Sequence, residues 1–300
     1  MKKSNFTPKG IIPALITPLT GNGDIHEKSL RQLIHYVIKG GVHGIFVSGT
    51  TGEFYGLSHQ QKRDLFQIAI DEADAKVPVY GGTAGITTRE CIQLTKIAQD
   101  CGVDAVSILT PMFIVPNQDQ LYQHYAAIAS ETDLPILLYN NVTKTGVNIT
   151  PVTVERLAGI NNIVGIKDSS GDFTLTAEYI RHTRDKNFHV LCGRDTLIHA
   201  CLCYGGAGAI AACANVAPRL VADIYDKYVD GDIAGSLEAQ YILAPLRLAF
   251  TLGTFPVVIK EALELIGIQA GECLAPVGQM TNDERMTLRK ILKDMELLTD

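Results

Sequence analysis

The chain has 300 residues, of which 46% are hydrophobic and 19% charged, with a net charge of −6 and a pI of about 5.8. This composition supplies a large apolar core, and the absence of a basic run argues against nucleic-acid binding. Residues 1–5 carry two lysines but precede no uninterrupted apolar stretch, so we expect a cytoplasmic protein with neither a signal peptide nor a membrane span.

Short apolar runs alternate with amphipathic stretches along most of the chain. The apolar runs predict strands at Gly10–Leu19, Gly44–Gly49, Val77–Gly81, Ala105–Pro111, Pro135–Asn140, Ile163–Ser169, His189–Gly193 and Gly208–Ala212. The amphipathic stretches predict helices at Glu27–Lys39, His59–Ala73, Thr88–Cys101, Gln118–Ser130, Pro151–Leu157, Leu175–Arg184, Leu197–Tyr204 and Pro218–Tyr228. Ser58, Asn117 and Thr150 each stand where a helix cap is expected.

Eight βα units in series predict a parallel sheet covered by helices, and their total length matches a closed (β/α)8 TIM barrel. An open doubly wound sheet is the alternative, although no GxGxxG motif follows the first strand. Beyond residue 232 the strand pattern stops, and helices are predicted at Ile233–Leu252, Val257–Leu265 and Asp283–Leu298. We therefore expect a barrel over residues 1–232 and a C-terminal three-helix appendage over 233–300 that is not an independent domain.

The sixth predicted strand ends in a lysine, an aspartate and two serines. Side chains alternate between the two faces of a strand, so Asp168 is not automatically the ion-pair partner of Lys167. Burial disfavours a charged ammonium group and favours the neutral amine, which is a nucleophile for a carbonyl carbon. The alternative is a structural lysine paired with another carboxylate, and the strand pattern alone does not decide between the two.

In a (β/α)8 barrel the active site lies at the C-terminal ends of the strands, and two further strand ends carry suitable side chains. Thr50 and Thr51 lie between two glycines, so that backbone N–H groups and hydroxyls can converge on a carboxylate, although an ordinary tight turn has the same composition. Glu53 is predicted to accept hydrogen bonds from nearby N–H groups rather than act as a base. Tyr139 ends the fifth strand, where a phenol can transfer protons or pack in the core.

These three features fit one kind of chemistry. The lysine would condense with the ketone of a 2-oxo acid, the threonines would hold its carboxylate, and the phenol would move protons. The protonated Schiff base is an electron sink, so the reaction requires neither a metal nor a coenzyme. A metal site is also not expected from the eight histidines, which show no HxH or HExxH spacing, or from the seven cysteines, which form no CxxC pair.

Four motifs in register resemble those of the dihydrodipicolinate synthase / N-acetylneuraminate lyase family, from about residue 8 to the C-terminus. They are Gly49-Thr50-Thr51-Gly52-Glu53, Tyr139-Asn140, Gly165-Ile166-Lys167-Asp168, and Gly208-Ala209-Ile210 leading to Asn215 and Pro218. The resemblance implies a class I pyruvate-dependent aldolase in which Lys167 forms the Schiff base and Tyr139 shuttles protons.

The same resemblance implies further roles around these two residues. Thr51 and the backbone near Thr50 would bind the pyruvate carboxylate, and Thr50 would hydrogen-bond Tyr139. The backbone of Ile210 would approach the bound pyruvate, and Gly193 would line the outer part of the pocket. Members of the family are commonly homotetramers built as dimers of dimers, with pyruvate as the substrate and no cofactor.

Three residues depart from the pattern of dihydrodipicolinate synthases. Phe113 replaces a tyrosine that completes a proton relay in the neighbouring subunit, and Lys144 replaces an arginine that grips the second substrate's carboxylate. Phe54 follows Glu53 where a small polar residue is usual, although it could equally be core packing. These departures favour an aldolase acting on a 2-keto-3-deoxy sugar acid or hydroxy-2-oxo acid over dihydrodipicolinate synthase, sialic-acid lyase or a dehydratase. The stretch around Lys260 resembles some 2-keto-3-deoxygluconate aldolases, and Lys260 itself is predicted to be a surface or interface residue.

Two functions of other kinds also stand open. A non-catalytic sensor could bind a 2-oxo acid without turnover, although such a protein needs no Schiff-base lysine. A phosphate-binding enzyme could use the glycine-rich stretch 205–208 before the last strand, but these glycines are predicted to form the turn that follows a helix.

Overall fold

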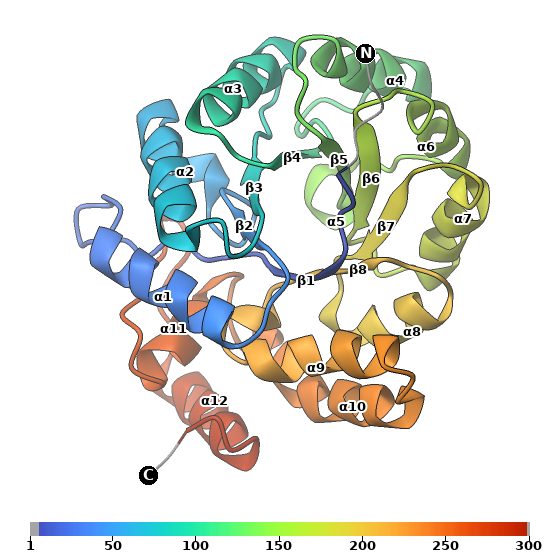
Figure 1. The fold of residues 1–300 in the computed structure, drawn as a ribbon. Coiled ribbons are helices and arrows are strands. Elements are labelled where there is room, and N and C mark those ends of the chain that lie inside the picture. The colour runs from blue at the N-terminus through green and yellow to red at the C-terminus, as the bar shows by residue number, and fades with distance from the viewer. Residues whose placement is uncertain (1–5, 299–300) are drawn as a thin grey trace.

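Eight parallel strands form a ring with helices outside it (Figure 1), in a computed structural model that describes residues 6–298. The hydrogen-bonded order is β1-β8-β7-β6-β5-β4-β3-β2. A parallel bridge between Ala14 and Phe46 closes the ring, with the Leu15 N–H donating to the Phe46 carbonyl at 2.9 Å. The predicted TIM barrel is therefore confirmed, and the open sheet is excluded.

The strands are β1 (Gly10–Pro13), β2 (Ile45–Val47), β3 (Val79–Gly82), β4 (Ala105–Leu109), β5 (Ile136–Asn140), β6 (Ile163–Asp168), β7 (His189–Cys192) and β8 (Gly208–Ala211). The α-helices are α1 (Glu27–Lys39), α2 (His59–Ala73), α3 (Thr88–Cys101), α4 (Gln118–Ala129), α5 (Val142–Thr145), α6 (Pro151–Leu157), α7 (Phe173–Thr183), α8 (Ile198–Cys203), α9 (Pro218–Val229), α10 (Ile233–Ala249), α11 (Val257–Leu265) and α12 (Asn282–Asp294). Short 3-10 turns are η1 (Phe54–Gly56), η2 (Asp195–Leu197), η3 (Cys213–Asn215) and η4 (Phe250–Leu252).

Helix starts follow the predicted caps closely. Ser58 and Asn117 form complete capping boxes at the N-termini of α2 and α4. Thr150 caps α6, and Pro151 occupies the first turn, where its missing N–H has no cost. By contrast, β1 is much shorter than predicted. Beyond it the side chain of Asn215 replaces the ladder, accepting from Ile16 N–H at 3.0 Å and donating to the Ala14 carbonyl at 2.7 Å.

The interior of the barrel is a packed layer rather than a channel. Each strand contributes one inward side chain to a buried cluster, namely Ile12, Phe46, Tyr80, Ala105, Leu137, Val164, Leu191 and Ile210, and Ala14 joins them just beyond β1. This layer forms the floor of the barrel mouth, so polar side chains at the next inward positions of the strands stand above it.

The helices beyond residue 232 pack against the outside of the barrel (Figure 1). Leu243 and Leu246 of α10 and Ile259 and Leu263 of α11 belong to the same core cluster as the helices around the barrel. The division of the chain at residue 232 stays a prediction. No single helix in the described part of the chain is long and apolar enough to cross a membrane, and the one helix pair that reaches the length, Ile233–Leu252 with Val257–Leu265, is bent by 119°.

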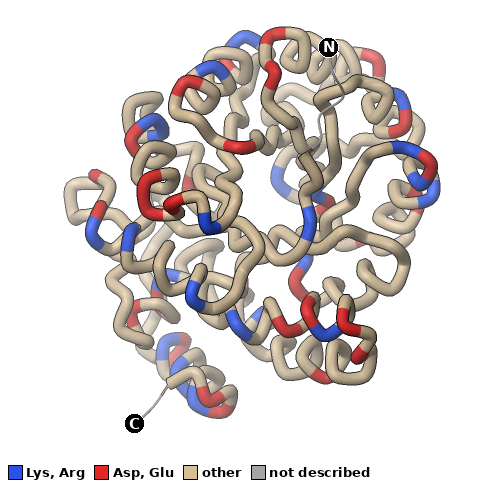
Figure 2. Tube along the Cα trace, in the orientation of Figure 1, with Lys and Arg blue, Asp and Glu red and all other residues tan. Residues whose placement is uncertain are grey.

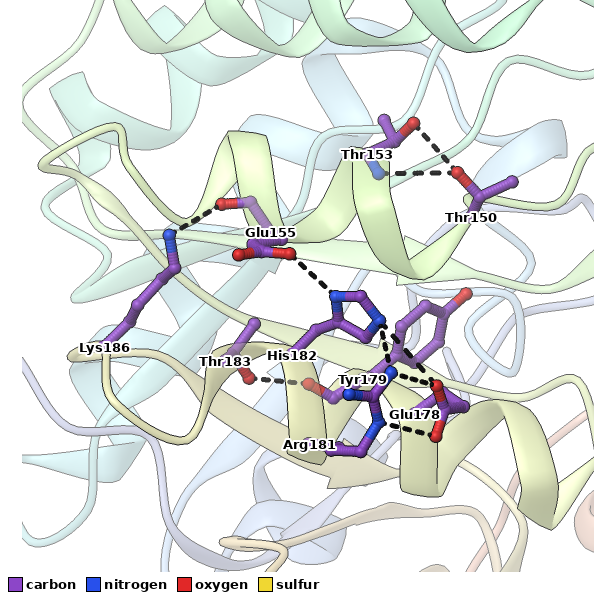
Figure 3. Close-up of polar contacts among 9 residues, drawn as sticks. All are labelled: Thr150, Thr153, Glu155, Glu178, Tyr179, Arg181, His182, Thr183 and Lys186. Carbon is purple, nitrogen blue, oxygen red and sulfur yellow. Dashed lines mark hydrogen bonds and ion pairs between the residues drawn. The ribbon is translucent and has the colours of Figure 1, made fainter.

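Charged residues of both signs are spread over the outer helices and loops (Figure 2). Between α6 and α7 they form a local network (Figure 3), in which His182 Nδ1 lies 2.7 Å from Glu155 Oε2. Such partly exposed pairs contribute little stability. Tyr179 beside them is fully buried, and its hydroxyl donates to the Ile149 carbonyl at 2.5 Å, which anchors the segment after β5 to α7.

Candidate active site

Lys167 and Tyr139 lie side by side above the barrel floor. They are register partners in the parallel ladder between β6 and β5, and each is only 4% exposed. The Lys167 Nζ atom lies 4.1 Å from the centroid of the Tyr139 ring and 5.3 Å from that of Phe46. An amine with these neighbours is enclosed largely by aromatic carbon.

Asp168 faces away from Lys167, as strand alternation predicts. Its carboxylate accepts hydrogen bonds from Thr176 Oγ1 at 2.6 Å, from Ser170 N–H at 3.0 Å and from Asn140 Nδ2 at 3.1 Å. Within residues 6–298, Lys167 forms no salt bridge with any carboxylate. A purely structural lysine buried by an ion pair is therefore excluded, and the amine is left without a carboxylate partner beside the Tyr139 ring.

The Tyr139 hydroxyl is held by two neighbouring side chains. Asn141 Nδ2 donates to it at 3.1 Å, and Thr50 Oγ1 lies 3.4 Å away. Burial alone would raise the pKa of Tyr139, but the charge of Lys167 and hydrogen bonds from Thr50, Asn141 and Ser169 outweigh it, so the pKa lies below its ordinary value. A phenol with this environment can both release and recover a proton.

The loop after β2 leaves two backbone donors pointing to no protein acceptor. Among the described residues, the N–H groups of Thr50 and Thr51 form no hydrogen bond, although Thr51 is only 4% exposed. The loop is turned by bonds from Glu53 N–H to the Thr50 carbonyl and from Phe54 N–H to the Gly49 carbonyl, each 3.2 Å long. Unpaired N–H groups beside a buried amine suit a carboxylate, so the loop forms an anion cradle.

A buried ion pair ties this cradle to the C-terminal helices. Glu53, with φ 55°, is fully buried, and its carboxylate lies 2.7 Å from Lys260 Nζ and accepts from Leu274 N–H at 2.6 Å. The prediction that Glu53 accepts hydrogen bonds is confirmed. The prediction that Lys260 is a surface or interface residue was wrong, because Lys260 is 2% exposed and also donates to the Glu272 carbonyl at 2.7 Å. Helical periodicity could not reveal a partner so distant in sequence.

One cavity of about 260 Å³ gathers every predicted site residue. Its lining includes Lys167, Tyr139, Thr50, Thr51, Gly193, Ile210 and Lys144. It also includes residues that sequence reasoning did not assign to the site, namely Ala14, Asn141, Thr143, Ser169, Arg194, Asp195, Ala212, Arg247, Phe250, Thr251 and Phe255. Asn141 and Ser169 directly follow β5 and β6, so their place at strand ends was a usable signal. Arg247 and Phe250 come from α10 and η4, and no sequence motif marks them.

Phe54 and the glycines before β8 have structural roles. Phe54 packs in a small buried cluster with Tyr139 and Leu109, so it shapes the wall behind the phenol. Gly205 N–H donates to the Leu202 carbonyl at 3.0 Å, and Gly206 N–H donates to the Cys201 carbonyl at 2.8 Å. These donors end α8, as predicted, and are not available to a phosphate.

Known proteins resemble this chain over nearly its whole length. A family model described as the dihydrodipicolinate synthetase family matches residues 7–295. A 4-hydroxy-tetrahydrodipicolinate synthase from Methanothrix thermoacetophila is 39% identical, covering 97% of this chain and 98% of the relative, and further relatives at 37–39% identity carry the same name.

Solved structures agree with the sequence relatives. A dihydrodipicolinate synthase from Acinetobacter baumannii, complexed with pyruvate, superposes with a TM-score of 0.94 at 34% identity, covering 97% of this chain and all of the other. A monomeric variant of dihydrodipicolinate synthase also gives a TM-score of 0.94, at 33% identity over 97% of each chain. The similarity therefore extends through the C-terminal helices as well as the barrel.

Proposed function

The chain belongs to the dihydrodipicolinate synthetase family and is a pyruvate-dependent class I lyase, and from this premise we propose that it condenses pyruvate with aspartate semialdehyde. The observation that carries the proposal is the common name of its full-length relatives, 4-hydroxy-tetrahydrodipicolinate synthase. The comparisons give no specific support to the sugar-acid reaction that the sequence departures favoured. The synthase, which the sequence departures disfavour, is the better-supported assignment.

In the proposed mechanism, the neutral Lys167 Nζ attacks the ketone carbon of pyruvate to form a carbinolamine. Tyr139 donates a proton to the oxygen that leaves as water, and the Schiff base results. Loss of a proton from the methyl carbon gives an enamine, which attacks the aldehyde carbon of the second substrate. The 4.1 Å separation between the Lys167 amine and the Tyr139 ring centroid supports this division of labour, and the mechanism uses no metal or organic cofactor.

The pyruvate carboxylate is assigned to the anion cradle of Thr50 and Thr51. Their two unpaired N–H groups supply donors, and the same cavity of about 260 Å³ extends to Lys144 and Arg247, which leaves room for a second substrate. Ile210 borders the bound pyruvate from β8, and Gly193 borders the outer part. A side chain at position 193 would collide with Ser169, since a Cβ atom there would overlap Ser169 Oγ.

Tyr139→Phe is expected to slow Schiff-base formation by about 10²-fold to 10⁴-fold, the usual contribution of a positioned proton donor. The KM for pyruvate should change little, because the cradle is intact. The lowered pKa of Tyr139 means that the phenol loses its proton below the ordinary tyrosine range, so the wild-type rate should decline on the alkaline side and the variant should lack that limb. Rapid quench with borohydride at a series of pH values measures both effects, and an unchanged rate in the variant would exclude Tyr139 as the shuttle.

The sugar-acid aldolase is the second candidate, and two residues favour it. Phe113, at the relay position, has no hydroxyl and is 89% exposed. Lys144 is exposed and lines the cavity, where it supplies a point charge in place of a bidentate guanidinium.

The deciding assay supplies pyruvate with aspartate semialdehyde, and in parallel a panel of 2-keto-3-deoxy acids whose cleavage releases pyruvate for lactate dehydrogenase. A higher kcat/KM for a sugar acid would overturn the synthase assignment, and pyruvate-dependent stabilisation without any turnover would favour the sensor.

Lys144→Arg tests the same choice within the protein. If aspartate semialdehyde is the acceptor, the variant should lower its KM by about threefold, a modest effect because an exposed charge is screened by salt. The KM for pyruvate should stay constant, since the cradle lies on another strand end. Steady-state kinetics with both substrates measure the change. An unchanged KM for aspartate semialdehyde, with improved use of a sugar acid, would contradict the proposal.

We also propose that the protein is a homotetramer, arranged as a dimer of dimers, in the cytoplasm. Phe113, Ile114 and Val115 support association, since they are 89%, 59% and 68% exposed and form an apolar surface on the loop after β4. Phe113 also adopts a left-handed backbone conformation with φ 72°. Because one structural neighbour is a monomeric variant, sedimentation at micromolar concentration is the required measurement.

A further inference from the structure

A guanidinium group enters the active-site cavity from outside the barrel strands. Arg247 lies in the last turns of α10, and its side chain is 20% exposed while lining the cavity that holds Lys167. Its Cζ atom lies 5.1 Å from the centroid of the Phe250 ring, which supports one face of the planar group. The guanidinium of Arg247 is therefore held against the Phe250 ring rather than extended into solvent.

The polar partners of Arg247 are few for a side chain so enclosed. In the described part of the chain, its one salt-bridge partner is Asp195, with 3.4 Å between Arg247 Nε and Asp195 Oδ2, and it makes no shorter hydrogen bond. A guanidinium has five N–H donors, and apart from the contact with Asp195 those of Arg247 have no acceptor among the described residues. The ion pair with Asp195 offsets part of the cost of desolvating the cation, and an arriving anion would supply acceptors for the remaining donors.

Asp195 has other hydrogen bonds besides its contact with the guanidinium. It is 2% exposed, its Oδ1 accepts from the Cys213 N–H at 3.0 Å, and its backbone carbonyl accepts from Gln240 Nε2 at 2.8 Å. Gln240 and Arg247 both belong to α10 and both contact Asp195 of η2, so these two contacts hold the helix against η2. Arg247 is thus held in place with free donors, which is the arrangement of a preorganised anion site.

We propose that Arg247 binds an anionic group, a carboxylate or phosphate, at the end of the acceptor aldehyde remote from the reacting carbonyl. The inference rests on the proposed function, because it takes the cradle of Thr50 and Thr51 as occupied by pyruvate. The second anion must then bind elsewhere in the same cavity. Lys144 also borders this cavity and adds a second positive charge near the same anion, but it is exposed, whereas Arg247 offers a planar fork supported by the Phe250 ring.

The test compares Arg247→Met and Arg247→Lys with the wild type and with Arg181→Met, a matched control on the outer face of α7 that pairs with Glu178 (Figure 3). Borohydride trapping of pyruvate on Lys167 is measured first. Kinetics then use three acceptors, namely aspartate semialdehyde, glyceraldehyde 3-phosphate and uncharged glyceraldehyde. Calorimetry with succinate on the borohydride-reduced pyruvoyl protein gives a readout that needs no turnover.

Arg247→Met should form the pyruvate adduct at the wild-type rate. For whichever anionic acceptor the enzyme uses, the variant should raise the KM by about tenfold to a hundredfold, and it should abolish succinate binding. Arg247→Lys should recover part of the affinity, while glyceraldehyde and the Arg181→Met control should be unaffected. The preference between carboxylate and phosphate acceptors identifies the anion. The inference alone is overturned if Arg247→Met forms the adduct normally and keeps the wild-type KM for anionic acceptors and the wild-type affinity for succinate. It is also overturned if the KM for glyceraldehyde rises as much as the KM for the anionic acceptors. Absence of the adduct in the wild type overturns the proposed function as well.

Discussion

Lys167→Ala is expected to eliminate the covalent reaction with pyruvate and to lower turnover by about 10⁴-fold or more, the order seen when a nucleophile is removed from an enzyme that works through a covalent intermediate. After incubation with pyruvate and borohydride, the intact mass of the wild type should rise by one reduced pyruvoyl group, and peptide mapping should place it on Lys167. The variant should show no increase. The reason is that the chemistry is carried by a bond to Nζ, which no neighbouring group can replace.

The stability of Lys167 variants separates loss of chemistry from loss of fold. Lys167 is 4% exposed and makes no salt bridge within residues 6–298, so burying its amino group lowers the stability of the folded protein. Lys167→Met, which conserves volume, should therefore unfold at the same temperature as the wild type or a higher one. Lys62→Met is the matched control, because Lys62 is also buried, at 5% exposed, but lies on α2 outside the cavity. An adduct that persists in Lys167→Ala and maps to another lysine would refute the assignment.

The architecture followed from the sequence because its signals are local. The bounds predicted for α1, α2, α3, α6 and α11 match the structure, since caps and periodicity act within a few residues. The pairing of Tyr139 with Lys167 followed from a global rule instead, that the C-terminal ends of the strands of a parallel barrel converge. The sequence therefore predicted which end of the barrel holds the site, and which strand residues point into the barrel at that end.

Features set by tertiary contact alone were missed. Arg247 sits on a helix whose periodicity does not distinguish a cavity-facing arginine from a solvated one, and only the packing of α10 against the barrel brings it to the site. The short helix α5 was also not predicted, because four residues give no measurable period. The burial of Lys260 was missed for the same reason, since its partner Glu53 is far from it along the chain. For Arg247 and Lys260 the deciding neighbour is remote in the chain, whereas α5 is too short to give a signal.

Lys260→Met is expected to destabilise the protein by about 3–5 kcal/mol, the usual cost of removing one partner from a buried ion pair. Among the described residues, the remaining Glu53 carboxylate would keep only the Leu274 N–H, at 2.6 Å, as a hydrogen-bond donor, and it would stay inaccessible to water. The double variant Glu53→Gln/Lys260→Met should lose less than the sum of the single changes, because it leaves no uncompensated charge. Urea unfolding of the four proteins measures this coupling.

The same pair should also control pyruvate binding, because Glu53 follows the cradle directly. Its left-handed backbone conformation, with φ 55°, is maintained by contacts from Lys260 and Leu274, so losing them should let Thr50 and Thr51 move. We expect the Lys260→Met variant to raise the KM for pyruvate more than it lowers the rate of adduct formation at saturation. Lys96→Met removes an exposed pair with Glu131 of the same 2.7 Å length and should alter neither stability nor KM. If Lys260→Met matches that control in both measurements, the C-terminal helices do not hold the cradle in place.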